Sequence, residues 1–498
     1  MCAGFDIEST QPLERIPIRH LTHNQRVAFA LMTCVFIWPR AARAITPELT
    51  SAIPPDALAV VLVQPSPRAQ HAEPATPDVV QWAALAVAGR SAPAAIAEVA
   101  GGLKSLRTFP WAVVLLDVRA RSIGADSHRL AFLSGALIVH TRGDNAAITQ
   151  EIQSVLERWT SADTARVDAL TTNGVRSYRL TDQRLPAWAA VEWGAVGDDY
   201  VITVGAGTFR RVVAGMHASR QTAEPDDWSL LLPAAEVGRA RVAWGLRSAA
   251  LRAALGDVMA GRPEQVLHAL GLARSDAVLW SLRRDRRAFI TRMVRRTGDA
   301  VRVTPITQAL PANDRWRNRL PEKATAYAYI PHPLARIVND AVDAWLALQR
   351  PDERVRIAQA FERFQQNAGV NVQSDLLDQL GDSLLIHDYP RHPAGLPLAD
   401  TILVPIDGDA GRARRALDAL LQQCADWVNP DRGGDGGSGH FWEPRIERLE
   451  DGIWTVRVGL YGPAVTVADG WLVLSYAPAA VRENLKLLAA PPEGGTHP

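Results

Sequence analysis

The pattern of hydrophobic and polar positions predicts one series of strands and helices that occurs twice. Apolar, β-branched runs predict strands, and apolar positions three or four apart predict helices. The first series, residues 45–220, contains expected strands 56–63, 111–118, 130–140, 174–180 and 191–204 and helices 78–88, 144–159 and 209–216. The second, residues 320–488, contains expected strands 324–330, 383–388, 401–406, 453–459 and 464–475 and helices 334–348, 354–366, 410–428 and 478–488.

Local details of the two series agree. The helix from Asp144 to Trp159 corresponds to a longer helix from Asp409 to Trp427. The difference is close to one helical turn, so the terminal tryptophan keeps its face. We therefore expect tandem repeated modules descended from one duplicated unit.

A shorter, partial module is expected between them, over residues 236–303. It contains a strand at 241–246 and a hairpin formed by 276–282 and 288–294. Residues 221–235 and 304–319 are the expected linkers, and residues 489–498 form a tail expected to be disordered. Trp228 and Trp316 lie in the linkers, so they are predicted to be exposed contact residues.

The mixture of elements favours one fold class. Several strands alternate apolar and polar positions, which is typical of sheets with one solvated face. We therefore predict an α+β fold, with mainly antiparallel sheet and helices packed on one face, rather than a doubly wound parallel sheet.

The first 44 residues have the pattern of a secretory signal. Arginines precede an apolar run from Val27 to Trp38, and Ala42-Arg43-Ala44 follows it. An uncleaved membrane anchor or a buried helix are the alternatives. Export to the periplasm, the cell envelope or the medium is therefore expected, with no transmembrane span once residues 1–44 are removed, because no later apolar run is long enough.

Net charge and cysteine content limit the expected partners and the possible disulfides. The net charge of +1 gives no general attraction to nucleic acid, so none is expected as a partner. After removal of Cys2 and Cys34 only Cys424 remains, and the mature chain can form no internal disulfide. Cys424 lies on an apolar helical stripe and is interpreted as a buried small hydrophobe.

One motif suggests a serine hydrolase. Gly381-Asp382-Ser383-Leu384 is similar to the signature of a lipase and esterase family. That family places its serine after a strand and before a helix, and needs a later Asp-x-x-His to activate it. Here a helical stretch precedes Ser383 and a strand follows, and no such element occurs later. Catalysis by Ser383 is not predicted.

Three other patterns point weakly to ligands. Gly205-Ala206-Gly207 lacks the third glycine of a dinucleotide loop and is interpreted as a tight turn. Asp431 to His440 has the wrong spacing for an EF-hand and is interpreted as a flexible loop. His387, Asp388 and His392 lack a further metal ligand. We therefore predict no catalytic residue, no cofactor and no metal.

The strongest local charge cluster lies at the tip of the middle hairpin. It consists of Arg283, Arg284, Arg286 and Arg287, with Arg292, Arg295 and Arg296 beyond. Guanidinium groups bind phosphate, sulfate and carboxylate well. The four tip arginines are therefore candidate anion-binding residues, while a solvated hairpin is the alternative.

The repeated elements resemble an uncharacterised family of exported bacterial proteins with a domain of unknown function. The resemblance rests on the strand openings Ile53-Pro54-Pro55-Asp56 and Leu320-Pro321-Glu322-Lys323 and on two segments. These run from Ala368 through Asp382 and from Ala468 to Ser475. The resemblance implies tandem α+β modules and identifies no catalytic residues.

The sequence thus favours an exported, non-catalytic cell-envelope protein of unknown biochemical role. It would act by binding or scaffolding an unknown envelope protein or polymer, through loops on a rigid scaffold. Two alternatives stay open. One is a hydrolase with a site assembled from distant residues, and the other is an anionic-glycan-binding protein that uses the arginine hairpin.

Overall fold

A computed structural model describes the greater part of the chain from Ile45 onward. The described residues are 45–65, 108–124, 127–159, 165–183, 185–186, 188–219, 227–256, 264, 274–311, 316, 319–347, 349–389, 401–429, 445–457 and 462–489. They belong to one compact unit formed by residues 39–73 and 103–498. The predicted signal, the helix at 78–88, the loop at 431–440 and tail residues 490–498 lie outside the described residues.

The first half forms a sheet with one short helix before it and two helices within it. Its strands are β1 (Ala59–Val63), β2 (Trp111–Gly124), β3 (Ser127–His140), β4 (Ala165–Thr172), β5 (Val175–Asp182), β6 (Val191–Val196) and β7 (Asp199–Val204); its helices are α2 (Pro47–Ser51), α5 (Ala146–Trp159) and α6 (Thr208–Ser219). The strands pair antiparallel in the order β1–β2–β3–β7–β6–β5–β4. Helix α6 lies against β3, β6 and β7.

The second half forms a similar sheet and carries more helix. Its strands are β12 (Tyr327–Ile330), β13 (Leu384–His387), β14 (Thr401–Pro405), β15 (Arg445–Arg448), β16 (Trp454–Arg457), β17 (Ala464–Ala468) and β18 (Trp471–Ser475); its helices are α10 (Leu334–Ala347), α11 (Pro351–Ala368), α12 (Val372–Asp375), α13 (Ala410–Val428) and α14 (Pro478–Ala489). The strands pair antiparallel in the order β12–β13–β14–β18–β17–β16–β15. Helices α13 and α14 lie against β17, and α14 also lies against β18.

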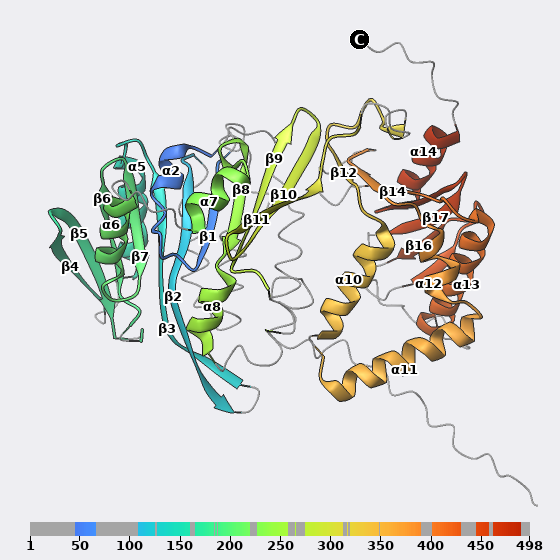
Figure 1. Ribbon diagram of the computed structural model, residues 1–498, viewed down its shortest axis with the longest axis horizontal. Coiled ribbons are helices and arrows are strands. Elements are labelled where there is room, and N and C mark those ends of the chain that lie inside the picture. The colour runs from blue at the N-terminus through green and yellow to red at the C-terminus, as the bar shows by residue number, and fades with distance from the viewer. Residues whose placement is uncertain are drawn as a thin grey trace, which may run out of the picture. The chain divides into compact units, whose positions relative to one another are not determined.

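A four-stranded meander joins the two halves (Figure 1). It consists of β8 (Val242–Leu246), β9 (Ala277–Asp285), β10 (Ala288–Thr297) and β11 (Ala300–Thr307), with helices α7 (Asp227–Ala234) and α8 (Ser248–Leu255). Strand β8 pairs antiparallel with β1, and β10 pairs parallel with β12 through Ala288 and Tyr327. The described strands thus form one continuous, mostly antiparallel sheet, and the predicted α+β class is confirmed.

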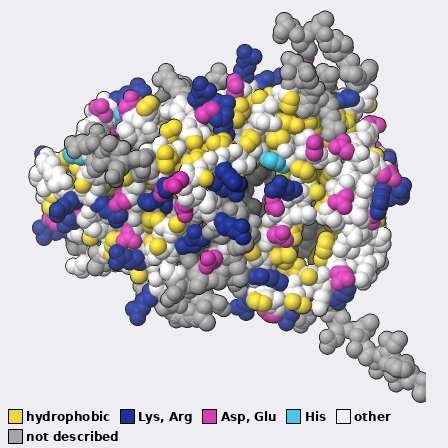
Figure 2. Space-filling view, in the orientation of Figure 1, with side chains coloured by type: hydrophobic (Ala, Val, Ile, Leu, Met, Phe, Trp, Pro, Cys, Tyr) yellow, Lys and Arg dark blue, Asp and Glu magenta, His cyan; other side chains and the backbone are white. Residues whose placement is uncertain are grey.

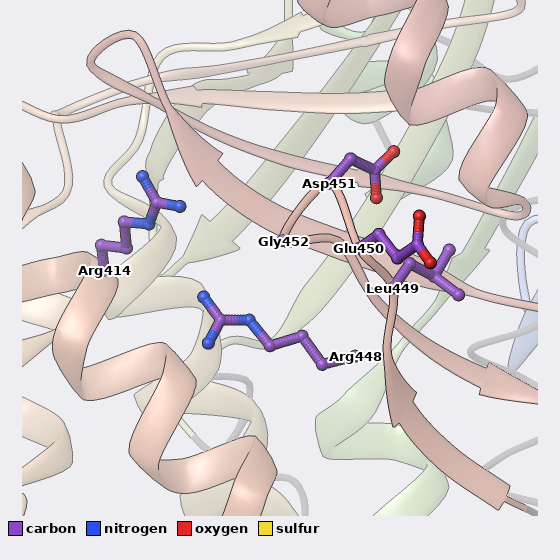
Figure 3. A pocket seen from close by; sticks show the side chains of 6 residues that line it. All are labelled: Arg414, Arg448, Leu449, Glu450, Asp451 and Gly452. Carbon is purple, nitrogen blue, oxygen red and sulfur yellow. The ribbon is translucent and has the colours of Figure 1, made fainter.

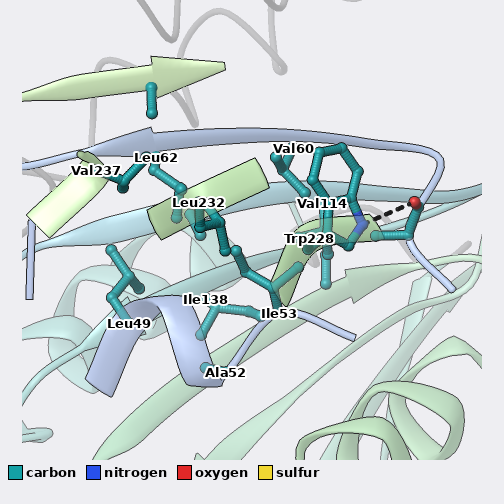
Figure 4. Close-up of a cluster of buried hydrophobic side chains, with 14 of the residues drawn as sticks. Leu49, Ala52, Ile53, Val60, Leu62, Val114, Ile138, Trp228, Leu232 and Val237 are labelled. Carbon is teal, nitrogen blue, oxygen red and sulfur yellow. Dashed lines mark hydrogen bonds between the residues drawn. The ribbon is translucent and has the colours of Figure 1, made fainter. Parts of the chain in front are cut away.

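Strand alternation builds the core of the first half. Val60 and Leu62 of β1 point to the same face as Val114 of β2, and all three are buried. Helix α7 covers this face, and its Trp228 donates its indole N–H to the carbonyl of Ala57 at 3.1 Å (Figure 4). The core is therefore completed by a helix that lies outside the predicted module.

Both linker tryptophans are buried, so the prediction that they are exposed contacts is wrong. Trp228 is 2% exposed and Trp316 is 0% exposed. Trp316 packs in the second core with Tyr329 and Trp471. An indole buries a large apolar area and places its N–H on a partner, which outweighs the polar character of the flanking linker residues.

Sequence analysis missed the outermost strand of each half, β4 and β15. Arg166 and Asp168 alternate with apolar residues in β4, and β15 is Arg445-Ile446-Glu447-Arg448. Charged residues are typical of edge strands, because they hinder pairing with another chain. They also dilute the apolar signal from which strands are predicted.

Candidate functional site

The predicted arginine cluster lies where the hairpin of β9 and β10 meets the second half. Arg286 occupies the turn between the strands, with a φ of 50°. Arg284 and Phe289 lie opposite each other on the two strands of the hairpin. The Arg284 guanidinium lies 5.6 Å from the centre of the Phe289 ring. The predicted tip residues are thus brought together, but their side chains do not converge on one open site.

Arg283 is held by an acidic residue from outside the hairpin. Its Nη1 donates to Oε2 of Glu236 at 2.7 Å, and Arg292 binds the other oxygen of the same carboxylate. Burial would raise the pKa of Glu236, but the bond from Arg292 and the charges of Arg292, Arg283 and Arg239 lower it. Glu236 therefore stays ionised and neutralises part of the cluster.

Two other tip arginines bind the opening of the second half. Arg284 Nη2 donates to the carbonyl of Thr325 at 2.7 Å, and Arg287 Nη2 donates to that of Pro321 at 2.6 Å. Tyr327 N–H in turn donates to the carbonyl of Arg287 at 2.8 Å. These bonds fasten the hairpin to β12, so the two arginines have structural partners.

A buried arginine that sequence analysis did not single out lies beside this cluster. Arg241 precedes β8 and is 4% exposed, and its Nε and Nη2 have no hydrogen-bond partner among the residues that the structure describes. Burial, with a smaller contribution from the charge of Arg284, lowers the pKa of Arg241 to about 10. A guanidinium without a counter-charge costs free energy when buried, so this position has unsatisfied anion-binding capacity.

Ser383 lies in the core and lacks the geometry of a nucleophile. It is 3% exposed, accepts from Trp316 Nε1 at 3.3 Å and donates to Asp382 Oδ1 at 3.1 Å. His387 ends β13, the strand that begins directly after Ser383, and lies roughly 13 Å away at the usual rise per residue. A base at that distance does not activate the hydroxyl.

His387 is buried behind α14, and Asp388 serves the backbone. His387 is 1% exposed, and its Nδ1 accepts from the N–H of Tyr389 at 3.3 Å. Asp388 Oδ1 accepts from the N–H groups of Thr325 and Ala326. His392, the third member of the predicted group, lies outside the described residues. Among the described residues no group of three or more His, Cys, Asp or Glu has the arrangement of a metal site.

The glycines after β7 form a tight turn. Gly205 N–H donates to Ala190 O at 2.9 Å, and Ala206 N–H donates to Trp188 O at 3.1 Å. Gly205 has a φ of +107°, and an added Cβ would lie 2.7 Å from the carbonyl oxygen of Leu133. These two N–H groups bond to the backbone and do not form a phosphate cradle.

An exposed apolar surface on α10 and α11 is the functional candidate that the sequence did not reveal. We call it the α10–α11 surface, and its large side chains are Ile337, Val342, Trp345, Val355 and Phe361, with exposures of 37%, 45%, 43%, 56% and 49%. Hydrophobic side chains are visible at the surface in the region of these helices (Figure 2). Large apolar side chains that are left exposed in one region mark candidate interaction sites.

These two helices bury few of their own residues. Ala344 is fully buried in α10, and no residue of α11 is. Helix α11 is held mainly through α13, and its Arg354 donates to the carbonyls of Ala347 and Gln349 at the end of α10. Both helices are amphipathic, so part of each apolar stripe is left unpartnered within the described residues.

Comparisons with known proteins add little. No family model matches this chain, and no curated protein does. The family resemblance is therefore not confirmed and stays a prediction. Three solved structures of TP0453, crystal forms III, IV and I, are similar at 10%, 10% and 9% identity, with TM-scores of 0.26, 0.25 and 0.24. They cover 51%, 51% and 53% of this chain and 82%, 81% and 82% of their own. Scores this low carry no argument.

No described helix is both long and apolar enough to cross a membrane.

Proposed function

We propose that this chain is an exported, non-catalytic protein of the cell envelope that binds a partner protein or polymer through the α10–α11 surface. The observation that carries the proposal is the exposure of Trp345 and Phe361 on two helices in which, among the described residues, only Ala344 is buried. An ordered surface of this kind, on a scaffold of sheet, suits binding or scaffolding. The signal pattern of residues 1–44 supports export.

We further propose that residues 45–220 and 320–488 are tandem copies of one module, with a partial module at 236–303. The support is topological. Each half pairs its seven described strands in one corresponding order, with the first, second and third strands followed by the seventh, sixth, fifth and fourth. The α10–α11 surface lies in the segment between the first and second strands of the second module.

Site-specific photo-crosslinking in the native host tests the proposal. A photoreactive phenylalanine analogue replaces Trp345 or Phe361, and Val167 on β4, which is 40% exposed, serves as the matched control position. We expect discrete crosslinked products in the envelope fraction from the first two positions and none from the third. Recovery of the protein in the cytoplasm, or equal crosslinking from Val167, contradicts the proposal.

Anion recognition at the hairpin is the second candidate, and buried Arg241 favours it. Its charge lies beside Arg284 and has no carboxylate partner among the described residues, so it adds to the positive field that an anionic glycan or similar polymer would meet at the hairpin tip. We expect an Arg284→Ala/Arg286→Ala variant to elute from a heparin column at lower salt than the wild type. An Arg356→Ala control on α11 should elute unchanged, and equal shifts in both variants would sink this candidate.

A further inference from the structure

An open pocket of about 490 Å³ lies between α13 and the turn that joins β15 to β16. Its lining residues are Arg414, Arg448, Leu449, Glu450, Asp451 and Gly452. We propose that this pocket binds a phosphate-type oxyanion between the guanidinium groups of Arg414 and Arg448. The volume lies within the range of small-molecule sites, and the proposal is independent of the α10–α11 surface.

The two guanidinium groups converge on one glycine. A Cβ added to Gly452 would lie 3.3 Å from Arg414 Nη2 and 3.9 Å from Arg448 Nη2. Gly452 has a φ of +78°, so other residues are disfavoured there by the backbone as well as by the arginines. In Figure 3 Arg414 extends from α13 and Arg448 reaches toward α13 from the opposite side, while the carboxylates of Glu450 and Asp451 lie to the right of both guanidinium groups.

Arg448 is oriented by two neighbours. Its Nη2 donates to Asp418 Oδ2 at 3.1 Å, and its guanidinium carbon lies 5.9 Å from the ring centre of Trp454. Trp454 Nε1 also donates to Asp418 Oδ1 at 2.8 Å. Asp418 and Trp454 thus fix the direction of the Arg448 side chain. A guanidinium group that is already oriented loses less conformational entropy when it binds a ligand.

The pocket is lined by two cations, Arg414 and Arg448, and by two carboxylates, Glu450 and Asp451. Asp418 neutralises Arg448, and Asp451 is paired with Arg482, a bond that lowers the pKa of Asp451. Arg414 forms no ion pair with a described residue. Two planar forks that approach from different elements match the several oxygens of a tetrahedral oxyanion better than the single plane of a carboxylate. The chemistry therefore points to phosphate.

Calorimetric titration with inorganic phosphate tests the site on the full chain. We expect saturable binding to the wild type and a loss of affinity of roughly ten- to a hundredfold in Arg414→Gln and in Arg448→Gln, since each removes charged hydrogen bonds. Arg415→Gln is the matched control, because it removes the same charge from the next residue of α13 without touching the pocket. Equal weakening in Arg415→Gln overturns the proposal.

A pair of glycine variants separates pocket chemistry from backbone strain. Gly452→Ala and Gly470→Ala change turn positions with nearly equal φ, +78° and +77°, but nothing lies within 4 Å of an added Cβ at Gly470. We expect weakened phosphate binding in Gly452→Ala alone, with both variants folded by circular dichroism. Equal affinities in the two variants contradict the geometry.

A parallel titration distinguishes a free oxyanion from a lipid headgroup. Vesicles of phosphatidylcholine with and without phosphatidic acid are offered to the wild type and to Arg414→Gln. Binding that requires phosphatidic acid and weakens in Arg414→Gln assigns the site to a lipid phosphate, while binding of inorganic phosphate alone assigns it to a soluble ligand. The absence of both kinds of binding in the wild type overturns the proposal.

Discussion

The indole rings of Trp316 and Trp471 meet edge to face inside the second core, with ring centres 4.9 Å apart and planes inclined by 64°. Trp316 comes from the segment between β11 and β12, and Trp471 begins β18. Trp228 is the tryptophan buried in the first core. Each half is thus completed by a tryptophan that precedes or follows the predicted module, so the connecting segments are structural parts of the fold.

Trp316→Ala should therefore destabilise the protein strongly. Loss of a fully buried indole, with the cavity that remains, costs about 3–5 kcal/mol of unfolding free energy. Urea denaturation followed by circular dichroism measures the change. Trp427→Ala is the control, because Trp427 is 67% exposed and its loss should cost less than about 0.5 kcal/mol. Similar losses in both variants would contradict the placement of Trp316.

The hairpin arginines should matter to stability through their acidic partners. Asp227 accepts from Arg247 Nε at 2.5 Å and is bonded by Arg296. Asp227→Asn leaves two guanidinium groups without a counter-charge. We expect a loss of about 1–3 kcal/mol, below the cost for a fully buried pair, because roughly a quarter of each arginine side chain is exposed.

Asp168→Asn provides the comparison for that measurement. Asp168 pairs with Arg166 on edge strand β4, and the Arg166 side chain is 79% exposed. Exposed pairs contribute less than about 1 kcal/mol, so the variant should unfold at nearly the wild-type urea concentration. If Asp227→Asn behaves in the same way, the ion pairs of Asp227 do not hold the hairpin.

Strand alternation let the sequence predict most of the sheet, because buried strands such as β1 and β18 are strongly apolar. Edge strands and buried linkers were missed since their roles depend on tertiary neighbours. The arginine cluster was found from charge alone, but its partners Glu236 and Asp227 lie far away in the sequence. The exposure of Trp345 and Phe361 likewise depends on which faces the sheet leaves uncovered.

Cys424 should react slowly with thiol reagents in the folded protein. Burial raises the pKa of its thiol, and the thiolate is the reactive form. We expect reaction with a disulfide reagent at pH 8 to be at least about tenfold slower in buffer than in urea. The rate at which free cysteine reacts with the same reagent is measured in buffer and in urea as the reference. Equal relative rates would place the thiol at the surface.

His387 should make the fold sensitive to acid. Burial lowers its pKa from 6.5 to about 4, with Arg287 acting in the same direction and Asp388 and Asn484 against it. Between pH 6.5 and 4 the unfolded chain therefore binds a proton that the folded chain excludes. The stability contribution is complete above pH 6.5 and falls with pH, by about 3 kcal/mol in total at pH 4.

Comparing how steeply stability changes with pH in the wild type and in a His387 variant isolates the His387 imidazole from the other titrating residues. Denaturation midpoints of the wild type and His387→Gln are compared from pH 7 to pH 4. We expect the wild type to lose more stability than His387→Gln over this range, whatever the variant costs at pH 7. Parallel slopes for the wild type and His387→Gln would show that His387 takes up its proton in the folded state.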